Sequence, residues 1–341
     1  MPHLNICSME HPMSYEPAPD RYDHMPYRRC GHSGLLLPAV SLGAWETFGG
    51  YRGADVARAC LYRAFDLGIT HFDLANNYGT PPGNAEIVCG EVIKTMPRDE
   101  LIISSKAGYT MWPGPYGDWG SRKYLTASCD QSLRRMGLDY FDIFYHHRPD
   151  PATPVAETLG ALKTLVDHGK ALYVGLSNYN GAQFAEAVRE AERIGLTITI
   201  HQPYYNLLAR SVERDLLPHT EKTGIGVIPF SPLASGLLSD KYLGDSIPAQ
   251  SRAAEKWGTE WVERNLNDER RAALNQLNAL ARTRNQTLAQ MALAWLLRLP
   301  TITSVLIGAS SVQQIEENVA ALANLAFSEN ELAQIDALAP Q

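Results

Sequence analysis

The sequence predicts an α/β fold in which one closed barrel of eight strand–helix units takes up most of the 341 residues. Short apolar runs alternate with longer amphipathic stretches along the chain, and eight such runs occur. The runs are almost continuous in apolar residues, as in parallel strands that are covered on both faces. Because eight units are present, a (β/α)8 or TIM barrel is favoured over an open, doubly wound sheet.

The elements follow in order. We expect an extended arm at 1–24, since it lacks periodicity, and a single barrel domain over 25–341. Segments 25–29 and 35–37 flank Gly31 and Gly34, whose tolerance of positive φ suits the tight turn of a β-hairpin. The predicted barrel strands are 40–43, 69–73, 101–106, 141–146, 172–176, 197–202, 226–230 and 304–307.

Two apolar stripes have the spacing of an amphipathic helix face. Gly68 follows the stripe that begins at Val56 and is expected to end that helix in a left-handed conformation, and Pro300 ends the helix with the stripe that begins at Leu288. Two intervals, 109–123 and 237–265, are longer than a plain strand–helix connection and follow the third and seventh strands, where barrel enzymes have their sites. We expect both to cover a site. The stripes consist of Val56, Cys60, Ala64 and Leu67, and of Leu288, Met291, Ala292, Trp295, Leu296 and Leu299.

Composition narrows the class of partner. The net charge of -7 argues against nucleic acid and anionic membranes, which need a basic surface. No apolar run is long enough to span a bilayer, and the first residues lack the zones of a signal peptide, so we expect a cytoplasmic protein with a small-molecule partner. The five cysteines are scattered without a Cys-x-x-Cys pair, which indicates reduced thiols and neither a disulfide framework nor a metal site.

Four residues that can transfer protons follow consecutive predicted strands. Asp73 ends the second strand, Tyr78 lies in the loop after it, Lys106 ends the third, and His147 follows the fourth. Alone, each has an ordinary structural explanation, such as a helix cap, a solvated charge or a packed ring. Together, the four residues could act as one proton-transfer group in which Tyr78 protonates a carbonyl oxygen. Lys106 would lower the pKa of the phenol, Asp73 would hold Lys106, and a neutral His147 would orient the substrate.

The usual dinucleotide-binding motif, Gly-x-Gly-x-x-Gly, does not follow the first strand. In a barrel, a phosphate site is commonly completed after strands seven and eight by a helix N-terminus. Residues 308–311 have this position and lead into a helix on which Gln314 and Asn318 share one face. We therefore expect a nucleotide there, although Ser310 could serve only as a helix cap.

The stretches HFDLANNYG, ELIISSKAGY, FDIFYHHRPD, GLSNYN, HQPYYNLL, IPFSPLASGLL and SVLIGASSVQQIEENV resemble, in order and spacing, those of the aldo-keto reductase superfamily. Through KAGYTMWPGPYGDWGSRKYL the chain is most similar to its bacterial L-glyceraldehyde-3-phosphate reductases, and next to the β subunits of voltage-gated potassium channels. The alternative function is thus a nucleotide-binding, redox-sensing regulatory subunit. The channel subunits have Asn where His147 stands, which favours a reductase.

The resemblance implies an NADPH-dependent reductase of small aldehydes, with L-glyceraldehyde 3-phosphate, methylglyoxal-like and aromatic aldehydes as substrates. It assigns catalysis to Asp73, Tyr78, Lys106 and His147, and it implies a homo-oligomer, a tetramer or octamer. It assigns NADP(H) binding to Gly43, Trp45, Asp73, Ser177, Asn178, Gln202, Phe230, Ser231, Leu233, Ser235, Gly236, Lys241, Arg252, Gly308, Ser310, Gln314, Glu317 and Asn318.

For the substrate we expect contacts from Tyr78, His147, Arg148 and an aromatic wall. Candidates for the wall are Trp45, Tyr109, Trp112, Tyr116 and Trp119, and the large rings of the 109–123 interval could equally anchor it on the barrel. Arg148, with Arg122 and Lys123, could attract a phosphorylated aldehyde, or these cations could be surface charges.

Overall fold

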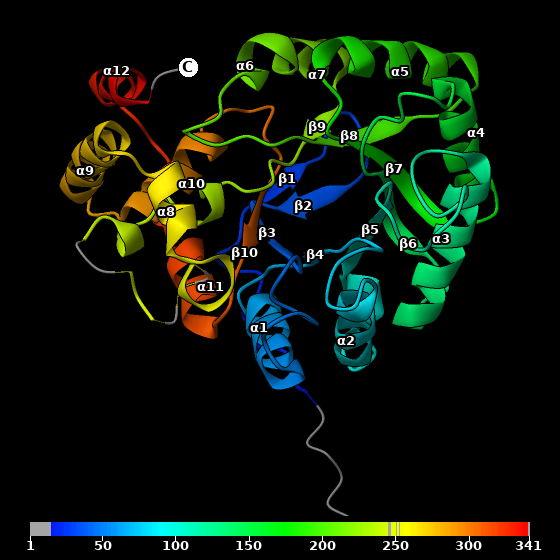
Figure 1. Cartoon of the computed structure of the whole chain (residues 1–341), viewed down its shortest axis with the longest axis horizontal. Coiled ribbons are helices and arrows are strands. Elements are labelled where there is room, and N and C mark those ends of the chain that lie inside the picture. The colour runs from blue at the N-terminus through cyan, green and yellow to red at the C-terminus, as the bar shows by residue number, and fades with distance from the viewer. Residues whose placement is uncertain (1–14, 245–246, 250, 252, 340–341) are drawn as a thin grey trace, which may run out of the picture.

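The computed structural model describes residues 15–244, 247–249, 251 and 253–339. Eight parallel strands form the centre, in the order β10-β3-β4-β5-β6-β7-β8-β9, and helices lie around them (Figure 1). All eight predicted strands are confirmed, with small shifts at their ends. They are β3 (Val40–Gly43), β4 (His71–Asp73), β5 (Ile102–Ala107), β6 (Phe141–His146), β7 (Ala171–Ser177), β8 (Ile198–Gln202), β9 (Gly226–Val227) and β10 (Val305–Gly308).

The sheet closes between β9 and β10. Val227 pairs with Ile302, and Phe230 with Leu306, in isolated parallel bridges. The Leu306 amide donates a hydrogen bond to the Pro229 carbonyl oxygen at 3.0 Å. Regular strand β9 is shorter than the predicted 226–230 because Pro229 has no N–H to continue the ladder. The predicted closed barrel is therefore confirmed.

The predicted hairpin is also present and closes the N-terminal end of the barrel. Strands β1 (Tyr27–Arg29) and β2 (Leu36–Pro38) pair antiparallel. Leu35 and Leu37 lie in one apolar cluster with Ile143, Ile200 and other side chains of the barrel interior. This arrangement leaves the opposite, C-terminal end of the barrel for the long loops.

The helices form the outer layer, and local signals fix several of their ends. Ser121 caps the start of α3 and Gly137 ends it in a left-handed conformation, while Gly68 takes the predicted positive φ of 84° just after α1. The helices are α1 (Ala54–Asp66), α2 (Asn84–Ile93), α3 (Arg122–Met136), α4 (Val155–Asp167), α5 (Gly181–Arg193), α6 (Val212–Asp215), α7 (Leu217–Thr223), α8 (Thr259–Asn265), α9 (Asp268–Thr283), α10 (Leu288–Leu297), α11 (Val312–Val319) and α12 (Glu329–Leu338).

Helix α10 contains the predicted stripe except Leu299, which lies beyond the end of the helix at Leu297, and it is buried more completely than a single apolar face implies. Leu293, Ala294 and Leu297, which lie off the stripe, are buried as well. The helix packs against α9, α11 and β10, so little of its surface meets water. In the described part of the chain, none of the helices has the length and apolar character that crossing a bilayer requires.

The described part of the predicted arm lies along α1. The ring of Tyr15 stacks on Tyr62 at 3.9 Å between centroids, and its hydroxyl donates to the Asp66 carboxylate at 2.7 Å. Residues 1–14, including Cys7, lie outside the described residues. The other cysteines, Cys30, Cys60, Cys89 and Cys129, are buried free thiols, as expected.

The two long intervals are more ordered than plain loops. Helix α3 already begins at Arg122, and the 237–265 interval contains short helices at Asp240–Tyr242 and Ala253–Trp257 before α8. Arg52, in the β3–α1 loop, pairs with Glu255 at 2.8 Å, and Lys256 pairs with Glu46 of the same loop. The second interval is thereby joined to the first strand–helix connection.

The hairpin generates a prediction about stability. Leu37 is fully buried inside the barrel, whereas its neighbour Leu36 is 48% exposed. Leu37→Ala should lower the free energy of unfolding by about 2–5 kcal/mol, since it removes buried methyl groups and leaves a cavity. Urea unfolding measures this. Leu36→Ala is the matched control and should change stability by about 0.5 kcal/mol or less. Equal losses in the two variants would show that the hairpin does not close the barrel in solution.

Candidate active site

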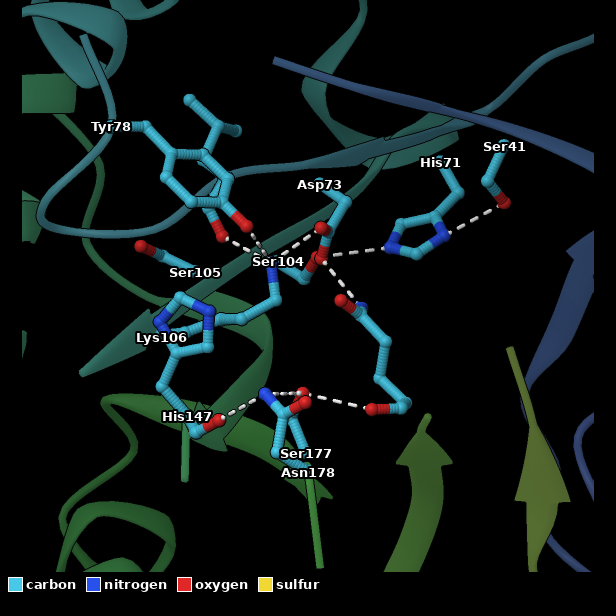
Figure 2. A network of polar contacts seen from close by, with 12 residues as sticks. Ser41, His71, Asp73, Tyr78, Ser104, Ser105, Lys106, His147, Ser177 and Asn178 are labelled. Atoms are coloured by element: carbon cyan, nitrogen blue, oxygen red, sulfur yellow. Dashed lines mark hydrogen bonds and ion pairs between the residues drawn. The ribbon is translucent and has the colours of Figure 1, made fainter. Parts of the chain in front are cut away.

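The four predicted catalytic residues lie together at the C-terminal end of the barrel. Asp73 ends β4, Lys106 lies near the end of β5, and His147 directly follows β6, so three neighbouring strands contribute one residue each. Tyr78 comes from the loop after β4. Figure 2 shows its phenol and the His147 ring close to the Lys106 ammonium. The structure therefore brings together the residues that sequence order alone separates.

The centre of this group is a fully buried ion pair. Lys106 Nζ donates to Asp73 Oδ2, and both side chains have no exposed surface. Lys106 Nζ also donates to the Leu74 carbonyl oxygen at 2.7 Å and lies 3.4 Å from the Tyr78 hydroxyl oxygen. All three N–H groups of the ammonium thus have an acceptor, which fixes its position relative to the phenol.

Burial controls the protonation of Tyr78 and Lys106. It raises the pKa of Tyr78 well above its usual value, and the charges of Asp73 and Tyr109 act in the same direction. Burial lowers the pKa of Lys106, and the Asp73 carboxylate opposes this. The net shift of the phenol pKa is upward although Lys106 lies beside it, because desolvation of the phenolate outweighs one cation already paired with Asp73. Tyr78 is protonated at neutral pH, as a proton donor must be.

His147 is buried and neutral. Burial lowers its pKa well below the usual value, followed by the charges of Lys106, His146 and Arg148. Its ring lies edge-on to Tyr78, with 5.9 Å between centroids, and to Tyr109, with 4.7 Å. Its Nδ1 has no hydrogen-bond partner among the residues that the structure describes. A neutral imidazole beside the phenol can donate a hydrogen bond to a substrate oxygen.

A cavity of about 570 Å³ opens from the catalytic group, in the size range of small-molecule and cofactor sites. Every residue predicted to bind cofactor lines it except Arg252, which lies outside the described residues. No cluster of three or more potential metal-binding side chains occurs in the described ranges. The predicted residues that line the cavity are Gly43, Trp45, Asp73, Ser177, Asn178, Gln202, Phe230, Ser231, Leu233, Ser235, Gly236, Lys241, Gly308, Ser310, Gln314, Glu317 and Asn318.

The end of the cavity away from Tyr78 has the chemistry of an anion site. Ser231, Ala234 and Ser235 all have positive φ, a conformation that non-glycine residues rarely adopt and that occurs at ligand sites. The Lys241 ammonium lines the cavity and makes no ion pair with any described residue. Across the cavity, the Ser310 amide donates to the Gln314 side chain at 2.9 Å. A lysine cation, together with the Ser231 and Ser235 side chains in the same lining, fits phosphate groups.

Three residues predicted to contact the substrate do not line the cavity, and neither does Trp119, the further candidate for the aromatic wall. Trp112 packs on Tyr124 of α3 with 5.3 Å between ring centroids. Tyr116 is half exposed, and the Lys123 ammonium lies 5.3 Å from its ring centre. Their position corrects the prediction of an aromatic substrate wall for these two rings, which instead anchor the 109–123 interval on the barrel. Trp45 and Tyr109 do line the cavity.

Arg148 is the third. Its guanidinium lies 3.7 Å from the ring centre of Trp119 and 4.2 Å from that of Tyr109, and it donates to the Gly108 carbonyl oxygen and to Asp118. It therefore stabilises the loop rather than facing the cavity. Arg122, the other arginine considered, donates to the Gly160 carbonyl oxygen and to Thr164 on α4.

Several residues of the site were missed from the sequence. Tyr51, Asn77 and Asp240 line the cavity. Asn77 lies in the HFDLANNYG stretch directly before Tyr78, whereas Tyr51 and Asp240 belong to none of the stretches that carry the resemblance. Ser104 and His71 contact the catalytic group from inside the barrel, and a signal for them existed. Each precedes a predicted catalytic residue by two positions, and the alternation of a strand places such residues on the same face.

The model of the aldo/keto reductase family matches residues 39–340. The chain belongs to this family. It is 54% identical over 329 residues to the L-glyceraldehyde 3-phosphate reductase of Escherichia coli, with 93% of each chain covered. It is 38% identical over 304 residues to a probable voltage-gated potassium channel subunit beta of Oryza sativa subsp. japonica, which covers 87% of this chain and 91% of that protein.

The buried histidines predict how stability depends on pH. Burial lowers the pKa of His71 and His146 to about 4 and that of His201 to about 3, and it acts in the same way on His147. The unfolded chain therefore binds protons below its histidine pKa of about 6.5 while the folded chain does not, so stability falls as the pH falls from there toward 4. From about pH 7.5 to about pH 5.5, each histidine should remove roughly 1 kcal/mol.

Urea unfolding across this pH range measures the loss. His146→Gln keeps a polar side chain beside Tyr179 and removes one titrating group, so its free energy of unfolding should fall by roughly 1 kcal/mol less than that of the wild type over the same range. An unchanged pH dependence in this variant would mean that His146 is charged, or exposed, in the folded protein.

Proposed function

We propose that this aldo/keto reductase reduces small aldehydes with NADPH and that Tyr78 is the proton donor. The observation that supports this most directly is the buried Asp73–Lys106 pair with its ammonium 3.4 Å from the Tyr78 hydroxyl, at the wall of a cavity large enough for a cofactor and a small substrate. A protonated phenol beside a fixed cation suits a reaction in which a carbonyl oxygen gains negative charge and then a proton.

Each of the four side chains has a separate role in the proposed reduction. The Tyr78 hydroxyl donates its proton to the carbonyl oxygen, and the Lys106 ammonium stabilises the phenolate that remains. Asp73 holds the ammonium in place, and neutral His147 donates a hydrogen bond that orients the carbonyl. NADPH, when bound, supplies the hydride. Since Tyr78 and His147 both line the cavity, the carbonyl oxygen is expected to lie between them.

The proposed cofactor contacts follow the chemistry of the cavity wall. Phe230 offers a ring face for the nicotinamide, and Ser177 and Asn178 offer polar groups for its carboxamide. The loop from Ser231 to Gly236 is proposed to hold the phosphates, and Glu317 and Asn318 the adenine. Lys241 is proposed to bind the 2′-phosphate, together with Arg252.

For the substrate we propose L-glyceraldehyde 3-phosphate, the compound in the name of the Escherichia coli relative. Methylglyoxal and aromatic aldehydes are proposed as further substrates, since Trp45, Tyr51 and Tyr109 give the cavity an aromatic lining. A panel of these aldehydes with NADPH, followed by the absorbance of the nicotinamide, tests the proposal. No turnover of any of them would contradict it.

The regulatory-subunit alternative is less well supported. The potassium channel relative is less similar than the reductase, and the histidine at position 147 is the residue expected of an efficient reductase. A cytoplasmic location is proposed from the lack of signal-peptide zones in the sequence, and a homo-oligomer, a tetramer or octamer, from the family resemblance alone.

Tyr78→Phe tests the proton donor, because it keeps the ring and deletes only the hydroxyl. Aldehyde reduction should fall by about 10²- to 10⁴-fold, the usual contribution of a general acid. NADPH affinity, measured by fluorescence titration, should change little because the proposed cofactor contacts come from other residues. Near-normal reduction with intact NADPH binding would exclude Tyr78 as the acid and direct attention to His147.

Lys106→Met should reduce kcat through the same step. Because Tyr78 and Lys106 act as one unit, the double variant should lose much less than the sum of the two single losses, in units of free energy. Steady-state kcat for the two single variants and the double variant provides the comparison. Strictly additive losses would show that the two residues act independently.

Lys241→Ala tests the choice of cofactor. A charged contact to a phosphate contributes roughly 1.5–3 kcal/mol, so the variant should bind NADPH about tenfold or more weakly while its NADH affinity barely changes. Lys163→Ala is the matched control, since Lys163 pairs with Asp167 on the outer helix α4 and should leave both affinities unchanged. Equal weakening of NADPH and NADH would move the 2′-phosphate away from Lys241.

A further inference from the structure

A line of polar side chains leads from Asp73 into the interior of the barrel. Ser104 Oγ donates to Asp73 Oδ1 at 2.6 Å, and His71 Nε2 lies 3.0 Å from Ser104 Oγ. Beyond the imidazole, His71 Nδ1 lies 2.9 Å from Ser41 Oγ, which lies 2.7 Å from Ser304 Oγ. All of these side chains are fully buried, and Figure 2 shows the line from Asp73 through His71 to Ser41.

The chemistry of the groups fixes the direction of each hydrogen bond. An ionised Asp73 can only accept, so the single hydroxyl proton of Ser104 points to it. Ser104 Oγ must then accept from His71 Nε2–H. A neutral imidazole has one N–H, so Nδ1 accepts from the Ser41 hydroxyl, and Ser41 in turn accepts from Ser304.

The imidazole is neutral for reasons that the surroundings supply. Burial lowers the pKa of His71 to about 4, Asp73 raises it, and Lys106 lowers it. Asp73 and Lys106 are the charged groups that face this part of the interior, and they are paired with each other. His71 therefore does not serve as a second cation for Asp73 at neutral pH.

Packing does not require these polar groups. Elsewhere in the barrel interior, Ile143, Ile200, Ile228 and Leu306 form an apolar cluster with the hairpin. Burying five hydrogen-bonding side chains in place of apolar ones is unfavourable unless each has a hydrogen-bond partner. In this line every side chain has a partner only when the hydrogen bonds run in the direction described above. The line ends on Asp73, the residue that holds Lys106.

We propose that His71 is a positioning residue for the reduction: with its proton on Nε2, it directs the Ser104 hydroxyl to Asp73 Oδ1, so that Oδ2 stays turned to Lys106 beside Tyr78. The inference rests on the proposed function. Two fixed donors, Ser104 and Gln202 Nε2 at 3.3 Å, hold Oδ1 and prevent rotation of the carboxylate.

Ser104→Ala deletes the donor to Asp73 and tests the proposal. Its kcat should fall about tenfold to a hundredfold, the contribution of a hydrogen bond to a charged group, with NADPH affinity and KM little changed. Ser105→Ala is the matched control. Ser105 is the next residue of β5, is equally buried, and donates to Glu86 at 2.6 Å, so its loss should affect thermal stability but not kcat. An equal fall of kcat in both variants, or none in Ser104→Ala, would overturn the proposal.

Two substitutions of His71 separate its two nitrogens. The amide of His71→Gln can place an N–H near the position of Nε2, so this variant should retain most of kcat. The shorter amide of His71→Asn reaches only as far as Nδ1, so this variant should resemble Ser104→Ala. Melting temperatures of both identify any loss of folding, and the Ser104 pair still decides the matter if either variant is unfolded. Equal kcat in two folded variants would overturn the role of Nε2–H.

A measurement without turnover distinguishes this inference from the proposed function. Nitrogen-15 NMR of the cofactor-free protein reports which ring nitrogen of His71 has the proton, with His71→Gln to assign the signal. A proton on Nε2 at neutral pH is expected, and a proton on Nδ1 or on both nitrogens would overturn the inference whatever the activity. If the wild type reduced no aldehyde although Nε2 had the proton, the proposed function would fail, and the positioning role with it.

Discussion

The arrangement of the site depends on one interaction, the buried ion pair between Asp73 and Lys106. Two charges without exposed surface are costly to remove from water, and their attraction offsets that cost only with good geometry and further hydrogen bonds. Here the remaining positions are filled by the Leu74 carbonyl oxygen, Ser104 and Gln202. Removing either partner would leave an isolated buried charge, so the strands that supply them must keep their register.

The interior of the barrel is divided between two kinds of packing. The side formed by β6, β8 and β9 is apolar and receives the hairpin, which gives most of the stability at the closed end. The polar line begins at Ser304, just before β10, runs through β3, β4 and β5, and ends on the ion pair. A barrel with an entirely apolar interior would be easier to stabilise. The buried polar side chains are therefore explained by their contact with the Asp73–Lys106 pair and not by stability.

The two long intervals are held on the barrel by different kinds of contact. The 109–123 interval is fixed by stacked cations and rings, with Arg148 between Tyr109 and Trp119, and it presents Tyr109 alone to the cavity among its aromatic residues. The 237–265 interval is joined to the loop after β3 by ion pairs that are partly exposed and therefore weak.

The sequence by itself determined the strands, the hairpin, the barrel and the gathering of Asp73, Tyr78, Lys106 and His147 at one rim, because apolar runs and the residues that end them are local properties. It also placed the Lys241 and Ser310 regions at one rim. It did not show that Arg148, Trp112 and Tyr116 turn away from the cavity, since nothing in the chain next to them reveals their partners. The tertiary structure alone decided the direction of the Tyr78 pKa shift and the contact of His71 with Asp73 through Ser104. Both depend on burial and on distances between strands, which no pattern along a single strand contains.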